Sequence, residues 1–135
     1  MRKEVGVVLV AGLLSGAAPA FAQEGDASAG ETVFKRCQVC HVVDSDQNKV
    51  GPTLQNVIGR TPGTVEGFRY SKAMQEFGED HVWDEETLTE YLAAPREVVK
   101  GTTMAFAGLK EEQQIADVIA YLKQFSDTGN GEAED

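Results

Sequence analysis

The chain has 135 residues, 41% of them hydrophobic and 25% charged, which is enough for one domain with a modest core. Acidic residues outnumber basic residues by 22 to 12, and the net charge is −10 at pH 7. Because affinity for nucleic acids comes mostly from Lys and Arg contacts to phosphate, this charge excludes a nucleic-acid-binding function.

Residues 1–22 have the pattern of a secretory signal peptide. A basic start is followed by apolar residues 5–14 and by the small-residue sequence Ala-Phe-Ala at 20–22. We expect cleavage between Ala22 and Gln23 and export to the periplasm. The alternative is a membrane anchor, but Gly, Ser and Pro shorten the apolar run below the length that spans a bilayer, so no stable anchor is expected.

The first predicted helix is capped by Asp26 and leads toward the cysteines. Its apolar face consists of residues at i, i+3, i+4 and i+7, namely Gly30, Val33, Phe34 and Cys37. Gly30 costs about 1 kcal/mol inside a helix relative to alanine. A close helix crossing would justify this glycine, and plain tolerance of a glycine is the alternative.

Residues 37–41 read Cys-Gln-Val-Cys-His, the C-x-x-C-H pattern of covalent haem attachment. Two thiols three positions apart can bond to the two vinyl groups of one porphyrin, and the next histidine lies under the iron. We therefore expect one haem c, attached through Cys37 and Cys40, with His41 as an axial metal ligand. The chain has two cysteines, so no thiol is left over, which suits an oxidising compartment.

Three other interpretations of the motif are weaker. A thioredoxin-like dithiol should follow a strand, whereas this motif follows a helical pattern. A structural zinc site needs four ligands, and His81 is the one histidine outside the motif. A disulfide within C-x-x-C would close a very short loop and therefore stabilise little.

Residues 42–67 have the composition of loops. Pro52 lies soon after the motif, and its carbonyl is free to accept a hydrogen bond. A haem-ligating histidine needs a partner on its other ring nitrogen, which fixes the tautomer and the orientation of the ring. Pro52 is a candidate for this partner, and an ordinary loop proline is the alternative.

Three further helices are predicted. Ser71 caps a short helix at 72–77 that Gly78 ends, and a helix at 85–94 begins after Asp84 and is stopped by Pro95. Residues 96–109 show no periodic spacing of apolar residues. An apolar stripe predicts the last helix at 111–126. With no convincing strand pattern, we expect an all-α fold of four to five short helices in one domain, residues 23–126, followed by an acidic disordered tail, residues 127–135.

The sixth ligand of the iron decides between two functions. An open position would bind small ligands, whereas a filled position would move electrons. Met104 lies in a loop without a helical stripe, Met74 is expected in the core, and His81 is expected in solvent. Spacing alone leaves open whether Met104 is the ligand.

The chain resembles the class I c-type cytochromes, the family of mitochondrial cytochrome c, and in particular their bacterial cytochrome c2 branch. The match extends over residues 25–125, in the same order along the chain. The matching positions are Gly25-Asp26, Gly30, Phe34, 37–41, Gly51-Pro52, Gly59-Arg60, 67–70, 83–88, 90–92, Pro95, 101–110 and 120–122.

This resemblance implies a compact fold around the haem, with the first helix crossing the last. It also implies that Met104 is the thioether ligand and that the Pro52 carbonyl accepts a hydrogen bond from His41. The resemblance also implies further haem-site residues. Arg60, Tyr70 and Trp83 would lie near the haem propionates, and Tyr91 would lie beside the methionine sulfur. Thr102 would make a polar contact with the haem, and Phe106 would lie at its exposed edge.

Three positions depart from the pattern that the resemblance suggests. Met74 stands where mitochondrial members have an asparagine in an internal polar network, so Met74 is a candidate to lie near the haem. Lys100 occupies a position that is often proline, and Thr103 replaces a frequent lysine.

The expected function is a soluble periplasmic electron carrier without enzymatic activity. The resemblance implies a cytochrome bc1-type complex as donor, and a terminal oxidase, photosynthetic reaction centre or other periplasmic reductase as acceptor. We expect a monomer that docks transiently on these membrane complexes through a basic ring: Arg36, Arg96, Lys100 and Lys110. Scattered solubilising charge is the alternative for this ring, and a haem-based ligand binder or sensor with a labile Met104 is the alternative function.

Overall fold

The computed structural model describes Gly16 and residues 24–127, and this part of the chain is helical without strands. Its helices are α1 (Ala27–Phe34), α2 (Lys72–Asp80), α3 (Glu85–Ala93), α4 (Pro95–Val98) and α5 (Glu112–Lys123). The predicted all-α fold class is therefore confirmed. The predicted signal peptide, apart from Gly16, and the tail beyond Asp127 lie outside the described residues and stay predictions.

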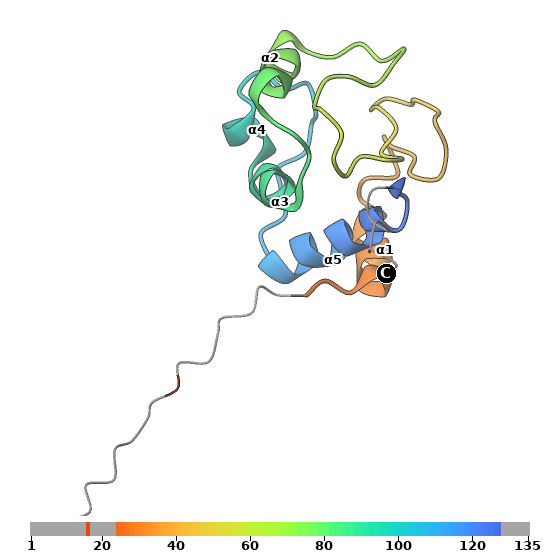
Figure 1. The fold of residues 1–135 in the computed structure, drawn as a ribbon, viewed down its shortest axis with the longest axis vertical. Coiled ribbons are helices and arrows are strands. Elements are labelled where there is room, and N and C mark those ends of the chain that lie inside the picture. The colour runs from red at the N-terminus through yellow and green to blue at the C-terminus, as the bar shows by residue number, and fades with distance from the viewer. Residues whose placement is uncertain (1–15, 17–23, 128–135) are drawn as a thin grey trace, which may run out of the picture.

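Helices α1 and α5 pack directly on each other (Figure 1). The Asp26 carboxylate caps α1 by accepting hydrogen bonds from the backbone N–H groups of Ser28 and Ala29. A Cβ atom on Gly30 would overlap the Asp117 carbonyl of α5, so only glycine allows this distance of approach. The expected crossing of the first and last helices is confirmed, and it explains why α1 tolerates a glycine.

Helix α2 is longer than expected. It begins after Ser71, whose hydroxyl accepts a hydrogen bond from the Met74 N–H at 3.1 Å, as predicted. However, the helix continues to Asp80, so the prediction that Gly78 ends it is wrong. A Cβ atom on Gly78 would overlap the Pro62 carbonyl, which shows that this glycine serves a packing contact within the helix.

Helix α3 begins after Asp84, whose carboxylate accepts the Thr87 N–H at 2.8 Å, and it ends at Ala93. Residues 95–98 then form the short helix α4, although no regular structure was expected between 96 and 109. Pro95 occupies the first turn of α4, where its missing N–H is not needed. The proline therefore separates two helices.

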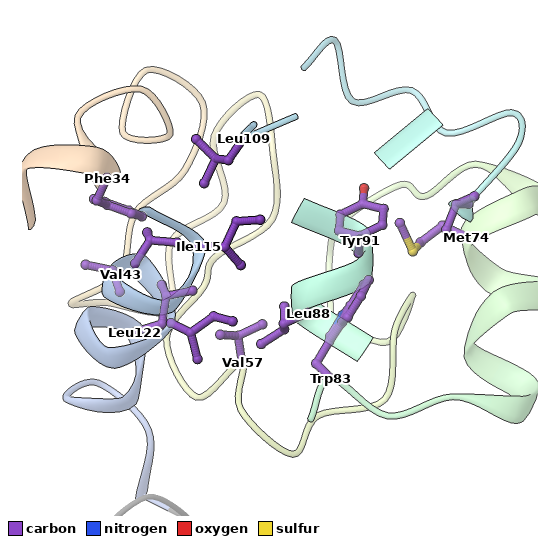
Figure 2. Close-up of a cluster of buried hydrophobic side chains, with 13 residues drawn as sticks. Phe34, Val43, Val57, Met74, Trp83, Leu88, Tyr91, Leu109, Ile115 and Leu122 are labelled. Carbon is purple, nitrogen blue, oxygen red and sulfur yellow. The ribbon is translucent and has the colours of Figure 1, made fainter. Parts of the chain in front are cut away.

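The buried core has two ends, which Figure 2 shows. One end lies beneath the α1–α5 crossing and includes Phe34 and Leu122, each 4% exposed. The other end contains Trp83, Tyr91 and Met74. Figure 1 shows α2, α3 and α4 on one side of the fold and the helix-free segment between α1 and α2 on the other.

Candidate haem-binding site

A cavity of about 260 Å³ lies between these loops and helices. Its lining includes every site residue expected from the sequence: Cys37, Cys40, His41, Pro52, Arg60, Tyr70, Trp83, Tyr91, Thr102, Met104 and Phe106. Met74 also lines the cavity, at 8% exposure, so it belongs both to the core and to the site.

The motif follows α1 in a series of hydrogen-bonded turns. The N–H of Cys37 donates to the Phe34 carbonyl at 2.7 Å, and the N–H of His41 donates to the Cys37 carbonyl at 2.9 Å. These local bonds bring both thiols and the imidazole to the cavity. The two cysteines form no disulfide with each other in this structure.

His41 is held through one ring nitrogen. Its Nδ1 lies 2.7 Å from the Pro52 carbonyl oxygen, which can only accept a hydrogen bond, so Nδ1 is the protonated nitrogen. Burial lowers the pKa of His41, while the Pro52 hydrogen bond acts in the opposite direction. A neutral imidazole with a fixed tautomer leaves Nε2 as the nitrogen that can bind a metal.

Cys37 is partly buried where it lines the cavity. Burial raises the pKa of Cys37, and the nearby Arg36 guanidinium acts in the opposite direction.

Among the described residues, no three His, Cys, Asp or Glu side chains are arranged to hold a metal ion, so the zinc alternative has no support there. His81 is exposed and stacks on the Phe77 ring at 3.8 Å, rather than lining the cavity.

Met104 reaches the cavity from the loop after α4. The Tyr91 hydroxyl donates to the Met104 sulfur at 3.8 Å and lies 3.5 Å from the Thr102 hydroxyl. Burial raises the pKa of Tyr91, so its hydroxyl remains a hydrogen-bond donor at neutral pH. Figure 2 shows Met74 at the same end of the core as Tyr91, where its apolar side chain forms part of the wall.

Arg60 is the half-buried cation of the site. Its guanidinium donates to the carbonyls of Thr53 at 2.9 Å and Gln55 at 3.0 Å. Burial lowers the pKa of Arg60, and Tyr70 acts in the opposite direction. No carboxylate pairs with Arg60 within residues 24–127, so its charge is available to an acidic group of a bound cofactor.

Several cavity residues were not predicted. Six of them are large apolar side chains to which the sequence assigned no role in the site: Leu54, Val57, Phe68, Leu88, Leu92 and Leu122. Leu88 and Leu122 lie on the predicted helix faces, but nothing in the sequence distinguishes a core position from a cavity wall. The loop residues Leu54, Val57 and Phe68 carry no periodic signal at all.

The cavity fits a flat, largely apolar macrocycle with acidic substituents. Two thiols and a neutral imidazole line it on the chain segment 37–41, and a thioether lines it from the segment after α4. The Arg60 guanidinium supplies a positive charge for acidic groups. These donors match a covalently attached haem and its two axial ligands.

The comparisons with known proteins agree with this site. The family model described as cytochrome c matches residues 27–126. Cytochrome c2 of Blastochloris viridis is 47% identical over 131 residues, covering 96% of this chain and 98% of that protein. Cytochrome c 2.1 of Caenorhabditis elegans is 53% identical over 100 residues, covering 73% of this chain and 88% of that protein.

Solved structures show the same fold. The structure of cytochrome c2 from Rhodospirillum centenum has a TM-score of 0.72 and 41% identity, covering 76% of this chain and 99% of that chain. Cytochrome cH from Methylobacterium extorquens has a TM-score of 0.69 and 40% identity, covering 74% of this chain and 99% of that chain. The match over most of the chain, together with the cysteines and histidine at the cavity, shows that this chain belongs to the cytochrome c family and carries a covalently attached haem c.

Proposed function

We propose that this monohaem electron carrier works in the periplasm, after cleavage near Ala22 and Gln23. It would take single electrons from a cytochrome bc1-type complex and deliver them to a terminal oxidase, a photosynthetic reaction centre or another periplasmic reductase. The observation that supports the proposal is that His41 and Met104 both line one largely apolar cavity. As the two axial ligands of the iron, they would leave no position for a substrate. For the same reason we propose no enzymatic activity.

The chain contributes rigidity and exclusion of water. Haem iron supplies the ferric and ferrous states between which the electron moves. The short hydrogen bond to Pro52 holds the His41 ring, and the Tyr91 hydroxyl donates to the Met104 sulfur over a longer distance, so the His41 side is held more firmly than the Met104 side. The apolar walls favour the state of lower charge, which raises the reduction potential.

No helix among the described residues is long and apolar enough to cross a bilayer. We propose that the protein acts as a monomer and reaches its membrane partners by transient docking. The side chains expected to form the basic ring are exposed: Arg36, Arg96, Lys100 and Lys110. In the described part of the chain the ion pairs are Lys72–Glu76 and Lys123–Glu85, so the ring cations are not neutralised by a carboxylate.

Charge reversal at Arg96 and Lys110 tests this docking. The double variant Arg96→Glu, Lys110→Glu should reduce the rate of reduction by a bc1-type complex about tenfold at low salt, and the difference should shrink as salt is added. Lys123→Glu is the matched control, because it reverses a partly exposed charge that pairs with Glu85. Equal rates and equal salt dependence for all three proteins would remove the docking proposal.

One observation favours the alternative function, a ligand binder with a labile Met104. The Tyr91 contact to the Met104 sulfur is long, at 3.8 Å, and Thr103 and Ala105 beside it are exposed. An absorption spectrum of the purified protein, with and without carbon monoxide, separates the two functions. A far-red methionine–iron band without a response to carbon monoxide supports the carrier, whereas ready carbon monoxide binding supports the ligand binder.

A further inference from the structure

Gly51 lies against the face of the His41 imidazole. A Cβ atom at position 51 would lie 2.7 Å from Nδ1 and 2.8 Å from Nε2 of that ring, and closer still to Cε1. All three nearest atoms belong to His41, so the glycine contacts the ring itself rather than a neighbouring side chain. The backbone of residue 51 therefore packs directly against the imidazole ring.

Space, rather than backbone conformation, requires glycine at this position. Glycines with a left-handed backbone in the described residues include Gly59, Gly63 and Gly67, but Gly51 is not among them. An alanine could adopt the Gly51 backbone without strain, and its methyl group would meet the imidazole. The requirement thus comes entirely from the distance between this backbone and His41.

The backbone at residue 51 cannot easily retreat. The N–H of Gly51 donates to the Cys40 carbonyl at 2.8 Å, and the Gly51 carbonyl accepts the N–H of Lys49 at 2.9 Å. Gly51 is buried, and the next residue, Pro52, accepts the Nδ1 proton of His41. A side chain at 51 would therefore displace the ring before it displaced the main chain.

We propose that Gly51 is a positioning residue that sets the height and tilt of the His41 imidazole, and that any side chain at 51 breaks the Nδ1–Pro52 hydrogen bond. This inference rests on the proposed role of His41 as an axial ligand. The Gly51 backbone would hold the imidazole between the Pro52 carbonyl and the cavity, although glycine has no side chain of its own.

The experiment uses ferrous holoprotein and two NMR observations on His41. In the native protein, a strong cross-relaxation peak should link an α proton of Gly51 to the Hε1 proton of His41. In Gly51→Ala, the Nδ1 proton should exchange with solvent about tenfold faster, since one buried hydrogen bond is lost. Gly67→Ala is the matched control, because its Cβ would meet only Asn48 at 3.8 Å although the backbone there is left-handed.

Faster exchange in Gly51→Ala together with native exchange in Gly67→Ala supports the inference. Equal exchange in Gly51→Ala and the native protein overturns it. Where Gly51→Ala does not accumulate as holoprotein, the native cross-peak decides, and its absence overturns the inference. A native protein whose His41 protons lack the shifts of an iron-bound imidazole would instead refute the ligand role of His41, so the two failures are distinguishable.

Discussion

The two sides of the cavity are built in different ways. On the His41 side, backbone groups do the holding, through the 2.7 Å bond to the Pro52 carbonyl and the glycine backbone against the ring. On the Met104 side, the Tyr91 hydroxyl contacts the sulfur at 3.8 Å, and Met104 itself lies in a loop whose neighbouring residues, Thr103 and Ala105, are exposed. Backbone hydrogen bonds of ordinary length are stronger and less mobile than a long hydroxyl–sulfur contact.

This difference predicts an order of events when the site is disturbed. The imidazole should stay in place while the thioether leaves, because the imidazole is held by a 2.7 Å hydrogen bond and the thioether only by a 3.8 Å contact. Oxidation of iron, alkaline pH or mild denaturant should therefore open the Met104 side first. The predictions below test this asymmetry, from the largest expected effect to the smallest.

The largest contrast is expected between alanine substitutions of the two proposed ligands. His41→Ala should yield little folded holoprotein, since it removes the group around which the 37–41 turn and Pro52 are arranged. Met104→Ala should yield folded holoprotein with an open iron that binds carbon monoxide. Its reduction potential should fall by on the order of 0.1 V or more, because the axial ligand sets the potential.

Absorption spectra and redox titration of both variants measure this contrast. A Met104→Ala protein that keeps the far-red band and does not bind carbon monoxide would show that another group fills the sixth position. Met74, which also lines the cavity, is a candidate. An intact, well-folded His41→Ala holoprotein would show that the His41 side matters no more for folding than the Met104 side.

The second prediction concerns the loop behind the His41 side. Arg60→Met removes both guanidinium bonds, to the carbonyls of Thr53 and Gln55, and should lower the free energy of unfolding by roughly 2 kcal/mol. Urea denaturation of the holoprotein measures this loss. Arg60→Lys should recover only part of it, because an ammonium group cannot reproduce the planar two-carbonyl geometry. Full recovery with lysine would mean that charge alone matters at this position.

The smallest effect is expected at Tyr91. Tyr91→Phe removes the long contacts to Thr102 and Met104 and should change the free energy of unfolding at pH 7 by about 0.5 kcal/mol. Because burial raises the pKa of Tyr91, the folded chain keeps this phenol protonated where the unfolded chain ionises it, at about pH 10. The stabilisation is complete below that pH and is lost as pH rises through the folded-state pKa.

Urea denaturation of the native protein and Tyr91→Phe at several pH values measures this effect. The free energy of unfolding of the native protein should fall more steeply above about pH 10 than that of the variant, which has no phenol at position 91 to ionise. Parallel curves would mean that the Tyr91 hydroxyl is not held in its neutral form by the fold.

Local signals in the sequence were sufficient for the beginnings of α1, α2 and α3 and for the chemistry of haem attachment. Asp26, Ser71 and Asp84 cap their helices as predicted, since a cap involves only the next three residues. The C-x-x-C-H motif is equally local, because covalent attachment requires two thiols and an imidazole at one fixed spacing. The family resemblance extended this knowledge to distant positions such as Met104, and the structure brings them to the same cavity.

The sequence by itself predicted the haem c cofactor and the all-α fold class, because the haem-attachment motif and the helix signals depend on residue type and short spacing. Spacing alone left the Met104 ligand open. Only the tertiary structure decided what Gly78 and Pro95 do, since the same residues can end a helix, support a contact or begin a new helix. It also decided the cavity walls and the role of Gly51. A residue without a side chain gives no sequence signal of the ring that rests on it, so only the folded backbone shows that contact.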